Sequence, residues 1–422
     1  MTDTVARSRE RKESLEDILV VDADVHVHES PGALIPYCEM PWRVALENIK
    51  DVQEFYLDIP GFSPGTTAYE AKFPSGQEGT RMVHDAEQMR RELDEIHVDI
   101  GILFPDHFLK IPVIAQIDYA AALARAYNAW LLDKWCHVDI GVLFPDHFLK
   151  IPVIAQIDYA AALARAYNAW LLDKWCDVEK GLLGCILACP QDPEDAACEI
   201  RRYAKEPGMV GVFLPCAGLE RLWGHRQYDP IYEAAQEADL PVLLHSVTVI
   251  HPVFPFNTHG FETEFGRHIC SHTFSIMANL VHMITTGVPV RYPHLRVAVT
   301  EAGISWVPFL MHKMDKEYVE RRREVPFLED KPSTYLKKMY FATQPVEEPE
   351  NLGDLVTMMN LYDGEDNTIF ASDWPHHDFD HPAKVHQVPF SNEVRRKVFG
   401  ENALRLFNID ANGKRLNLQG DG

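Results

Sequence analysis

Short apolar runs with strand character alternate along this chain with helical segments, and this alternation limits the fold more than any other feature. Strands are predicted at residues 18–26, 182–189, 210–214, 241–245, 295–300, 339–343 and 368–372. Helices are predicted at residues 195–204, 229–238, 273–286 and 306–323. Strands that alternate with helices over most of a chain are typical of an α/β fold with a parallel sheet.

A forty-residue segment occurs twice in tandem. Residues 97–136 recur as residues 137–176 with one change, from Ile102 to Val142. Each copy is predicted to form a strand, at 98–104 or 138–144, followed by a Pro-Asp-His loop and a helix. Solenoid repeats diverge and occur in arrays of three or more. Two nearly identical copies therefore indicate a recent duplication or an assembly artefact.

The strand count predicts a (β/α)8 TIM barrel with an extra duplicated βα unit. Seven strands outside the duplication plus one copy give eight, the number that closes such a barrel, whereas both copies give nine. We expect one copy to supply the second strand and the other to be extruded or partly disordered; a larger open sheet is the alternative. The expected organisation is a mobile arm over residues 1–17, a barrel over 18–410 and a tail over 411–422.

The charge and the cysteines exclude several classes of protein. A formal net charge of −23 opposes a nucleic-acid partner, because phosphate binding needs surplus Lys and Arg on one face. The N-terminus lacks the apolar run of a signal peptide, and no stretch approaches the ~20 apolar residues of a membrane span. The eight cysteines show no zinc-knuckle or redox spacing. We expect a cytoplasmic protein without a membrane partner, and the sequence leaves a homo- or hetero-oligomer open.

Side chains with metal-binding chemistry stand where four predicted strands end. The first strand ends in His26 and His28, and their spacing of two places both imidazoles on one face. Later strands end at His245, Glu301 and Asp373. One such residue alone is more often a solvated cap or a satisfied core residue. Because active sites of barrels lie at the carboxyl ends of the strands, the ordered set predicts a divalent-metal site.

The motifs DVHVH, LLH, TEAGISWVPFLMHKMD and FASDWPHHD, in this order, resemble the amidohydrolase-related branch of the metal-dependent amidohydrolase superfamily, which includes aminocarboxymuconate semialdehyde decarboxylase and γ-resorcylate decarboxylase. The likeness runs from about residue 20 to residue 409. It implies that one divalent metal is bound by His26, His28, His245 and Asp373, and that Asp373 is also the proton shuttle. A bound divalent ion lowers the pKa of its water toward ~7, and an adjacent carboxylate then takes the proton.

The chain departs from those decarboxylases after the sixth strand, where they typically place a histidine and this chain has Glu301. A carboxylate makes the site harder, which favours iron or manganese over zinc, so zinc, iron and manganese all stay open. His376 and His377 follow Asp373 closely and are candidates for holding a second ion. Alternatively they line the pocket or orient Asp373 without contacting an ion.

The leading functional hypothesis is a hydrolase or non-oxidative decarboxylase of a small carboxylated or cyclic substrate. Asp373 is its acid and base, and His245 polarises the scissile group in a hydrolysis as well as binding metal. One alternative is a dinuclear non-haem oxygenase, with two irons or iron and manganese, which Glu301 favours. Another is a catalytically silent partner subunit.

Four further residues are candidates for substrate contacts. His268 and His272 belong to a long aromatic and His-rich stretch after the fifth strand, where loops usually shape substrate access. Arg221 and Arg226 follow the fourth strand, and a guanidinium can bind a carboxylate through two parallel hydrogen bonds. Most arginines in folded proteins are nevertheless exposed to solvent and bind no substrate.

Overall fold

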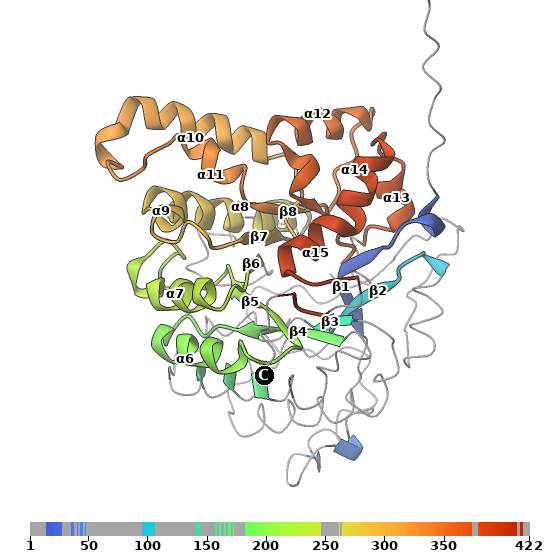
Figure 1. Ribbon diagram of the computed structural model, residues 1–422, viewed down its shortest axis with the longest axis horizontal. Helices are drawn as coiled ribbons and strands as arrows, with labels where there is room; N and C mark the ends of the chain where they lie inside the picture. The colour runs from blue at the N-terminus through green and yellow to red at the C-terminus, as the bar shows by residue number, and fades with distance from the viewer. Residues whose placement is uncertain are drawn as a thin grey trace, which may run out of the picture.

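The computed structural model describes residues 14–27, 35–37, 95–105, 141–143, 182–245, 264–373, 379–411 and 414–416, with isolated residues among 40–47 and 157–172 and residue 261. Within these ranges nine strands run parallel and follow one another in chain order (Figure 1). β1 (Val21–Val27) pairs with β2 (Ile100–Pro105). A seven-stranded sheet contains β3 (Gly141–Leu143), β4 (Leu182–Leu187), β5 (Met209–Pro215), β6 (Val242–His245), β7 (Val297–Thr300), β8 (Tyr340–Ala342) and β9 (Thr368–Ile369).

Each copy of the duplicated segment supplies a strand. β2 comes from the first copy and pairs with β1, whereas β3 comes from the second copy and pairs with β4. The prediction that one copy would be extruded is therefore wrong, and the described strands number nine rather than eight. The physical reason is that both copies carry the same apolar strand sequence, which suits the edge of β1 as well as the edge of β4. The helix predicted in the first copy lies outside the described residues.

The last strand meets the first through a buried side chain. The carboxylate of Asp22 in β1, which is 0% exposed, accepts a hydrogen bond from the amide of Ser372 at 2.9 Å and another from its hydroxyl. β2 and β3 lie next to each other between the two sheets. The strands therefore follow one another around a ring, and the predicted class, a parallel α/β barrel, is confirmed.

Helices cover the outside of this ring. Figure 1 shows α6 (Pro193–Tyr203), α7 (Asp229–Glu237), α8 (Glu264–Thr285) and α10 (Val307–Arg321) stacked beside β4 to β7. The shorter helices are α9 (Val288–Arg291), α11 (Pro332–Leu336), α12 (Gly353–Leu361), α13 (Pro382–His386), α14 (Asn392–Arg396) and α15 (Asn402–Phe407). The predicted helices are present, but α8 begins at Glu264 and takes in residues expected to belong to a connection.

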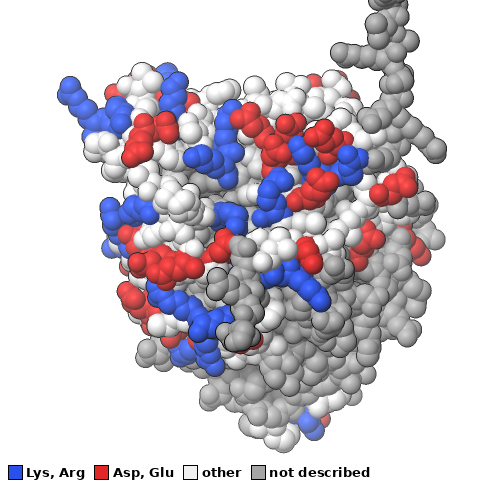
Figure 2. All heavy atoms as spheres, in the orientation of Figure 1, with Lys and Arg blue, Asp and Glu red and all other residues white. Residues whose placement is uncertain are grey.

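Local sequence explains why these segments form where they do. Asp192 caps α6 by accepting a hydrogen bond from the amide of Asp195, and Pro193 stands at the first helical position, where its missing N–H costs nothing. All seven residues of β5 are buried, as expected for a parallel strand covered on both faces. No helix in the described ranges is long and apolar enough to cross a membrane. On the described part of the face in Figure 2, basic and acidic side chains are interspersed.

Candidate metal and catalytic site

Two buried acids that follow strands have backbone angles in the left-handed region. Glu301 follows β7 with φ 54°, and Asp373 follows the β9 segment with φ 63°. Their exposed fractions are 7% and 1%. A non-glycine residue in this region costs on the order of 1–3 kcal/mol and persists only where its surroundings hold it; such residues cluster at functional sites. The fold thus maintains both acids at the strand-end rim against a local penalty.

The Glu301 carboxylate lies between two imidazoles. His245 is the last residue of β6, and its Nδ1 is 3.3 Å from Glu301 Oε2. His272 on α8 approaches from the other side, with its Nδ1 3.3 Å from Glu301 Oε1. The parallel register sets His245 opposite Thr300, directly before Glu301. All three side chains are buried, so the electrostatic interactions among them are weakly screened.

Asp373 is held by a residue that sequence reasoning missed. The side-chain amide of Gln344 donates from Nε2 to Asp373 Oδ2 at 3.1 Å, and Gln344 is 0% exposed. Gln344 lies two residues beyond β8. The rule that selected the other site residues, a polar side chain just after a buried strand, also selects Gln344. The sequence nevertheless assigns it no role, because an amide is neither a usual metal ligand nor an acid.

The predicted site residues are thus only partly described. His245, Glu301 and His272 form one cluster, and Asp373 is hydrogen-bonded to Gln344. His26 belongs to β1, where its backbone pairs with Phe104, but its side chain lies outside the described residues. The same holds for the side chain of His268 in α8, and for all of His28, His376 and His377.

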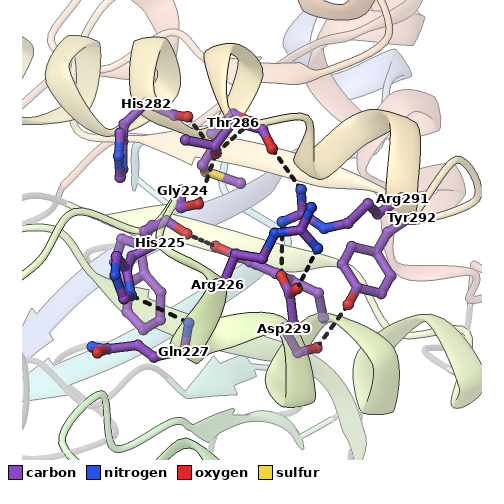
Figure 3. A network of polar contacts seen from close by, with 12 residues as sticks. Gly224, His225, Arg226, Gln227, Asp229, His282, Thr286, Arg291 and Tyr292 are labelled. Atoms are coloured by element: carbon purple, nitrogen blue, oxygen red, sulfur yellow. Dashed lines mark hydrogen bonds and ion pairs between the residues drawn. The ribbon is translucent and has the colours of Figure 1, made fainter. Parts of the chain in front are cut away.

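The two candidate arginines lie on the surface. Arg221 and Arg226 are exposed, and Arg226 pairs with Asp229 at 3.5 Å. Figure 3 shows the polar network around Asp229. The Asp229 carboxylate also forms an ion pair with the guanidinium of Arg291, with a nitrogen–oxygen distance of 2.7 Å. In the same network the hydroxyl of Thr286 donates to the carbonyl of Gly224 at 2.7 Å. These contacts tie the segment after β5 to α8 and α9.

The donor set fits a divalent ion. Imidazole and carboxylate at buried strand ends are the ligand types that zinc, iron and manganese take in proteins. Taken by themselves, the described residues contain no group of three His, Cys, Asp or Glu side chains placed to hold a metal. The predicted set extends to His26 and His28, whose side chains are not among those residues.

The chain is similar to several known proteins. It is 25% identical to γ-resorcylate decarboxylase of Polaromonas sp. over 234 residues, which cover 52% of this chain and 68% of that protein. The crystal structure of 5-carboxyvanillate decarboxylase from Sphingomonas paucimobilis has a TM-score of 0.61 at 19% identity, covering 93% of this chain and 100% of that one. Dihydroxybenzoic acid decarboxylase from Polaromonas sp., solved with manganese and 2-nitroresorcinol, has a TM-score of 0.56 at 16% identity, covering 94% and 99%.

These solved structures share the fold, and none of the three relatives is an oxygenase, so they give that alternative no support. The family model described as amidohydrolase matches residues 149–409, from inside the second copy of the duplication to the end of α15 and just beyond. This range takes in His245, Glu301 and Asp373 and more than half of the sequence. The chain therefore belongs to the amidohydrolase family of enzymes.

Proposed function

We propose that this chain is a divalent-metal-dependent, non-oxidative decarboxylase of hydroxylated aromatic carboxylates. The observation that carries the proposal is that two acids after strand ends, Glu301 and Asp373, are buried, and that His245 contacts the first of them. The decarboxylases of γ-resorcylate, 5-carboxyvanillate and dihydroxybenzoate support it, because they share family or fold with this chain. The substrate would be a small aromatic acid with a hydroxyl group next to its carboxylate.

The metal would be held by His26, His28, His245 and Asp373, with Glu301 as a further ligand or as the partner that orients His245. Manganese is the proposed ion, because a related structure contains it and because Glu301 makes the donor set harder than an all-histidine set. When bound, a divalent ion supplies positive charge that binds and orients the substrate carboxylate and its neighbouring oxygen. A second ion at His376 or His377 is not needed for this reaction.

Asp373 would carry the proton that replaces the carboxyl group. It delivers the proton to the ring carbon that bears the carboxylate, the bond from that carbon to the carboxyl breaks, and carbon dioxide leaves while the electron pair stays with the ring. Solvent then returns one proton to Asp373 in each turnover. Its burial keeps bulk water from competing for this proton. His245, with Nδ1 toward Glu301, would present Nε2 to the ion.

The proposal also includes the setting in which the enzyme acts. Cys185, Cys189, Cys198, Cys216 and Cys270 are present as thiols, which supports a reducing, cytoplasmic location. His268 and His272 remain proposed substrate contacts from α8, and Arg221 and Arg226 remain candidates at the surface. Assembly into a homo- or hetero-oligomer stays a prediction that size-exclusion chromatography with light scattering would test.

The test is carbon dioxide release from 2,6-dihydroxybenzoate and 5-carboxyvanillate by the manganese-loaded protein, with the aromatic product followed by chromatography. Chelation of the metal should abolish turnover, and re-addition of Mn²⁺ should restore it. Asp373→Asn should lower kcat by about 100-fold or more, because general acid catalysis contributes that much. The control is Glu324→Gln at an exposed acid, which should leave kcat unchanged.

Three outcomes would contradict the proposal. Oxygen uptake during turnover, with about two irons per chain, would identify an oxygenase. Hydrolysis of an amide or lactone without carbon dioxide release would identify a hydrolase. Absence of any turnover by metal-loaded protein would favour the silent partner subunit.

A further inference from the structure

We propose that Gln344 is a positioning residue, which holds the Asp373 carboxylate in a fixed orientation and joins it to the segment that carries Glu301. The inference rests on the proposed function, because it assigns Gln344 a role in metal binding and proton delivery through Asp373. Nothing in the metal-binding motifs assigns a role to the strand end after β8, which lies between the strand ends that bear the two acids.

The first contact runs through the side chain. Gln344 Nε2 donates to Asp373 Oδ2 at 3.1 Å, and both side chains are buried. An amide N–H is only a donor, so this contact directs Oδ2 of the carboxylate toward Gln344. Asp373 also has a backbone conformation that is maintained only by its surroundings. The Gln344 amide is one of the groups that supply this restraint.

The second contact runs through the main chain. The carbonyl of Gln344 accepts a hydrogen bond at 3.1 Å from the amide of Gly303, two residues after Glu301. Gly303 has φ 66°, and a Cβ there would lie 2.7 Å from Glu347 Oε1 and 2.9 Å from the carbonyl oxygen of Pro345. Only glycine therefore allows the segment after β7 to approach the segment after β8 this closely.

Glu347 forms hydrogen bonds that link the same two segments. Its Oε1 accepts hydrogen bonds from the amide of Ile304 at 3.1 Å and from that of Ser305 at 2.8 Å. Residues 303–305 are thereby linked to residues 344–347, and Gln344 contacts Asp373 through its side chain and Gly303 through its carbonyl. Gln344 therefore orients the Asp373 carboxylate through its side chain, while its carbonyl holds the neighbouring segment that carries Glu301. Small errors in such geometry are costly, since a displacement of about 1 Å can lower a rate 100-fold.

The experiment compares the wild-type protein with Gln344→Met, which keeps the length of the side chain and removes the donor. Mn²⁺ affinity is measured by titrating the metal-free protein against a chromophoric chelator, and kcat and KM are measured at saturating Mn²⁺. We expect Mn²⁺ affinity to fall by about 10- to 100-fold, as for other groups that orient a metal ligand. We also expect kcat to fall by about tenfold or more, with KM changed less than kcat.

Asn367→Leu provides a matched control. Asn367 is also a buried amide, and it donates to the carbonyl of Lys337 at 2.8 Å from the opposite end of the β9 segment. Its loss should lower Tm without changing Mn²⁺ affinity or kcat. Gln344→Asn is the second variant and covers the case in which methionine prevents folding. It keeps a buried amide but withdraws it by about 1.5 Å, and the same losses are expected.

The outcomes separate the inference from the function on which it rests. If wild-type protein binds Mn²⁺ and decarboxylates, and both Gln344 variants fold with unchanged Mn²⁺ affinity and kcat, the positioning role is wrong. A lowered Tm alone, as in Asn367→Leu, would give Gln344 a structural role only and would also overturn the inference. If wild-type protein binds no Mn²⁺, the proposed function fails, and the inference fails with it.

Discussion

Asp22 links the first strand to the last at a single buried side chain. Its carboxylate accepts hydrogen bonds from both the amide and the hydroxyl of Ser372, and Ser372 directly precedes Asp373. The same strand β1 continues to His26. A carboxylate that is not itself a proposed metal ligand therefore links the strand that contains His26 to the segment that contains Asp373.

Replacement of Asp22 should destabilise the fold. Asp22→Ala leaves two buried donors of Ser372 without their acceptor, and the expected loss in free energy of unfolding is about 2–4 kcal/mol. Asp22→Asn keeps one oxygen acceptor and should lose less than half of that amount. Urea denaturation followed by circular dichroism measures both. An Asp22→Ala protein within about 0.5 kcal/mol of wild type would show that the contact contributes little.

Part of the candidate site can be proposed from the sequence for a geometric reason. Barrel strands end at one rim, so His245, Glu301 and Asp373 could be assigned from their places after apolar runs. The approach of His272 to Glu301 could not, because it depends on where α8 lies against the strands. Gln344 could not be given a role either, since its contacts reach across two neighbouring segments and leave no spacing in the sequence.

The start of α13 depends on polar contacts that change with pH. His381 caps this helix, and its Nδ1 accepts a hydrogen bond from the amide of Ala383 at 3.0 Å. Burial, with a smaller contribution from His97, lowers the pKa of His381 from 6.5 to about 4. Next to it, Asp380 accepts from the amide of Val346 and from Lys384 Nζ. The cap thus requires a neutral imidazole where the segments after β8 and β9 meet.

Stability should fall in acid because of His381. Its folded-state pKa is depressed, so the unfolded chain takes up a proton as the pH falls through about 6.5 while the folded protein does not. The stability that the neutral cap contributes is present above that pH and is lost toward pH 4. His381→Ser keeps a capping oxygen and does not titrate. The Tm of wild type minus that of His381→Ser should decrease steadily between pH 7 and pH 4.5; a constant difference would rule out this role.

The described ranges contain nine parallel strands of this barrel, whereas the sequence predicts eight. The alternation of strands and helices predicted the class because each βα unit must bury its apolar strand between helices and sheet. The strand number could not be predicted, since pattern alone does not exclude a second copy of a competent strand. The family match begins at residue 149, inside the second copy, and omits the whole first copy.

Deletion of residues 97–136 should give a folded enzyme. The remaining copy supplies the same strand apart from one residue, and it can pair with β1 and β4 at once in an eight-stranded ring. We expect Tm at least as high as that of the full chain and decarboxylation at least as fast. Calorimetry and the carbon dioxide assay measure both. An unfolded deletion variant would show that the ninth strand is required.

β2 and β3 come from duplicated segments that differ only at Ile102 and Val142. Either copy can therefore pair with β1 or with β4, and the two pairing arrangements are expected to have nearly equal stability. A chain that pairs the wrong copy first must release it before the ring completes, because the misplaced strand leaves backbone amides unpaired. Neighbouring units of high identity are prone to this kind of misassembly, within one chain and by exchange between two chains. The duplication is therefore expected to slow the folding of this chain and to favour its misassembly.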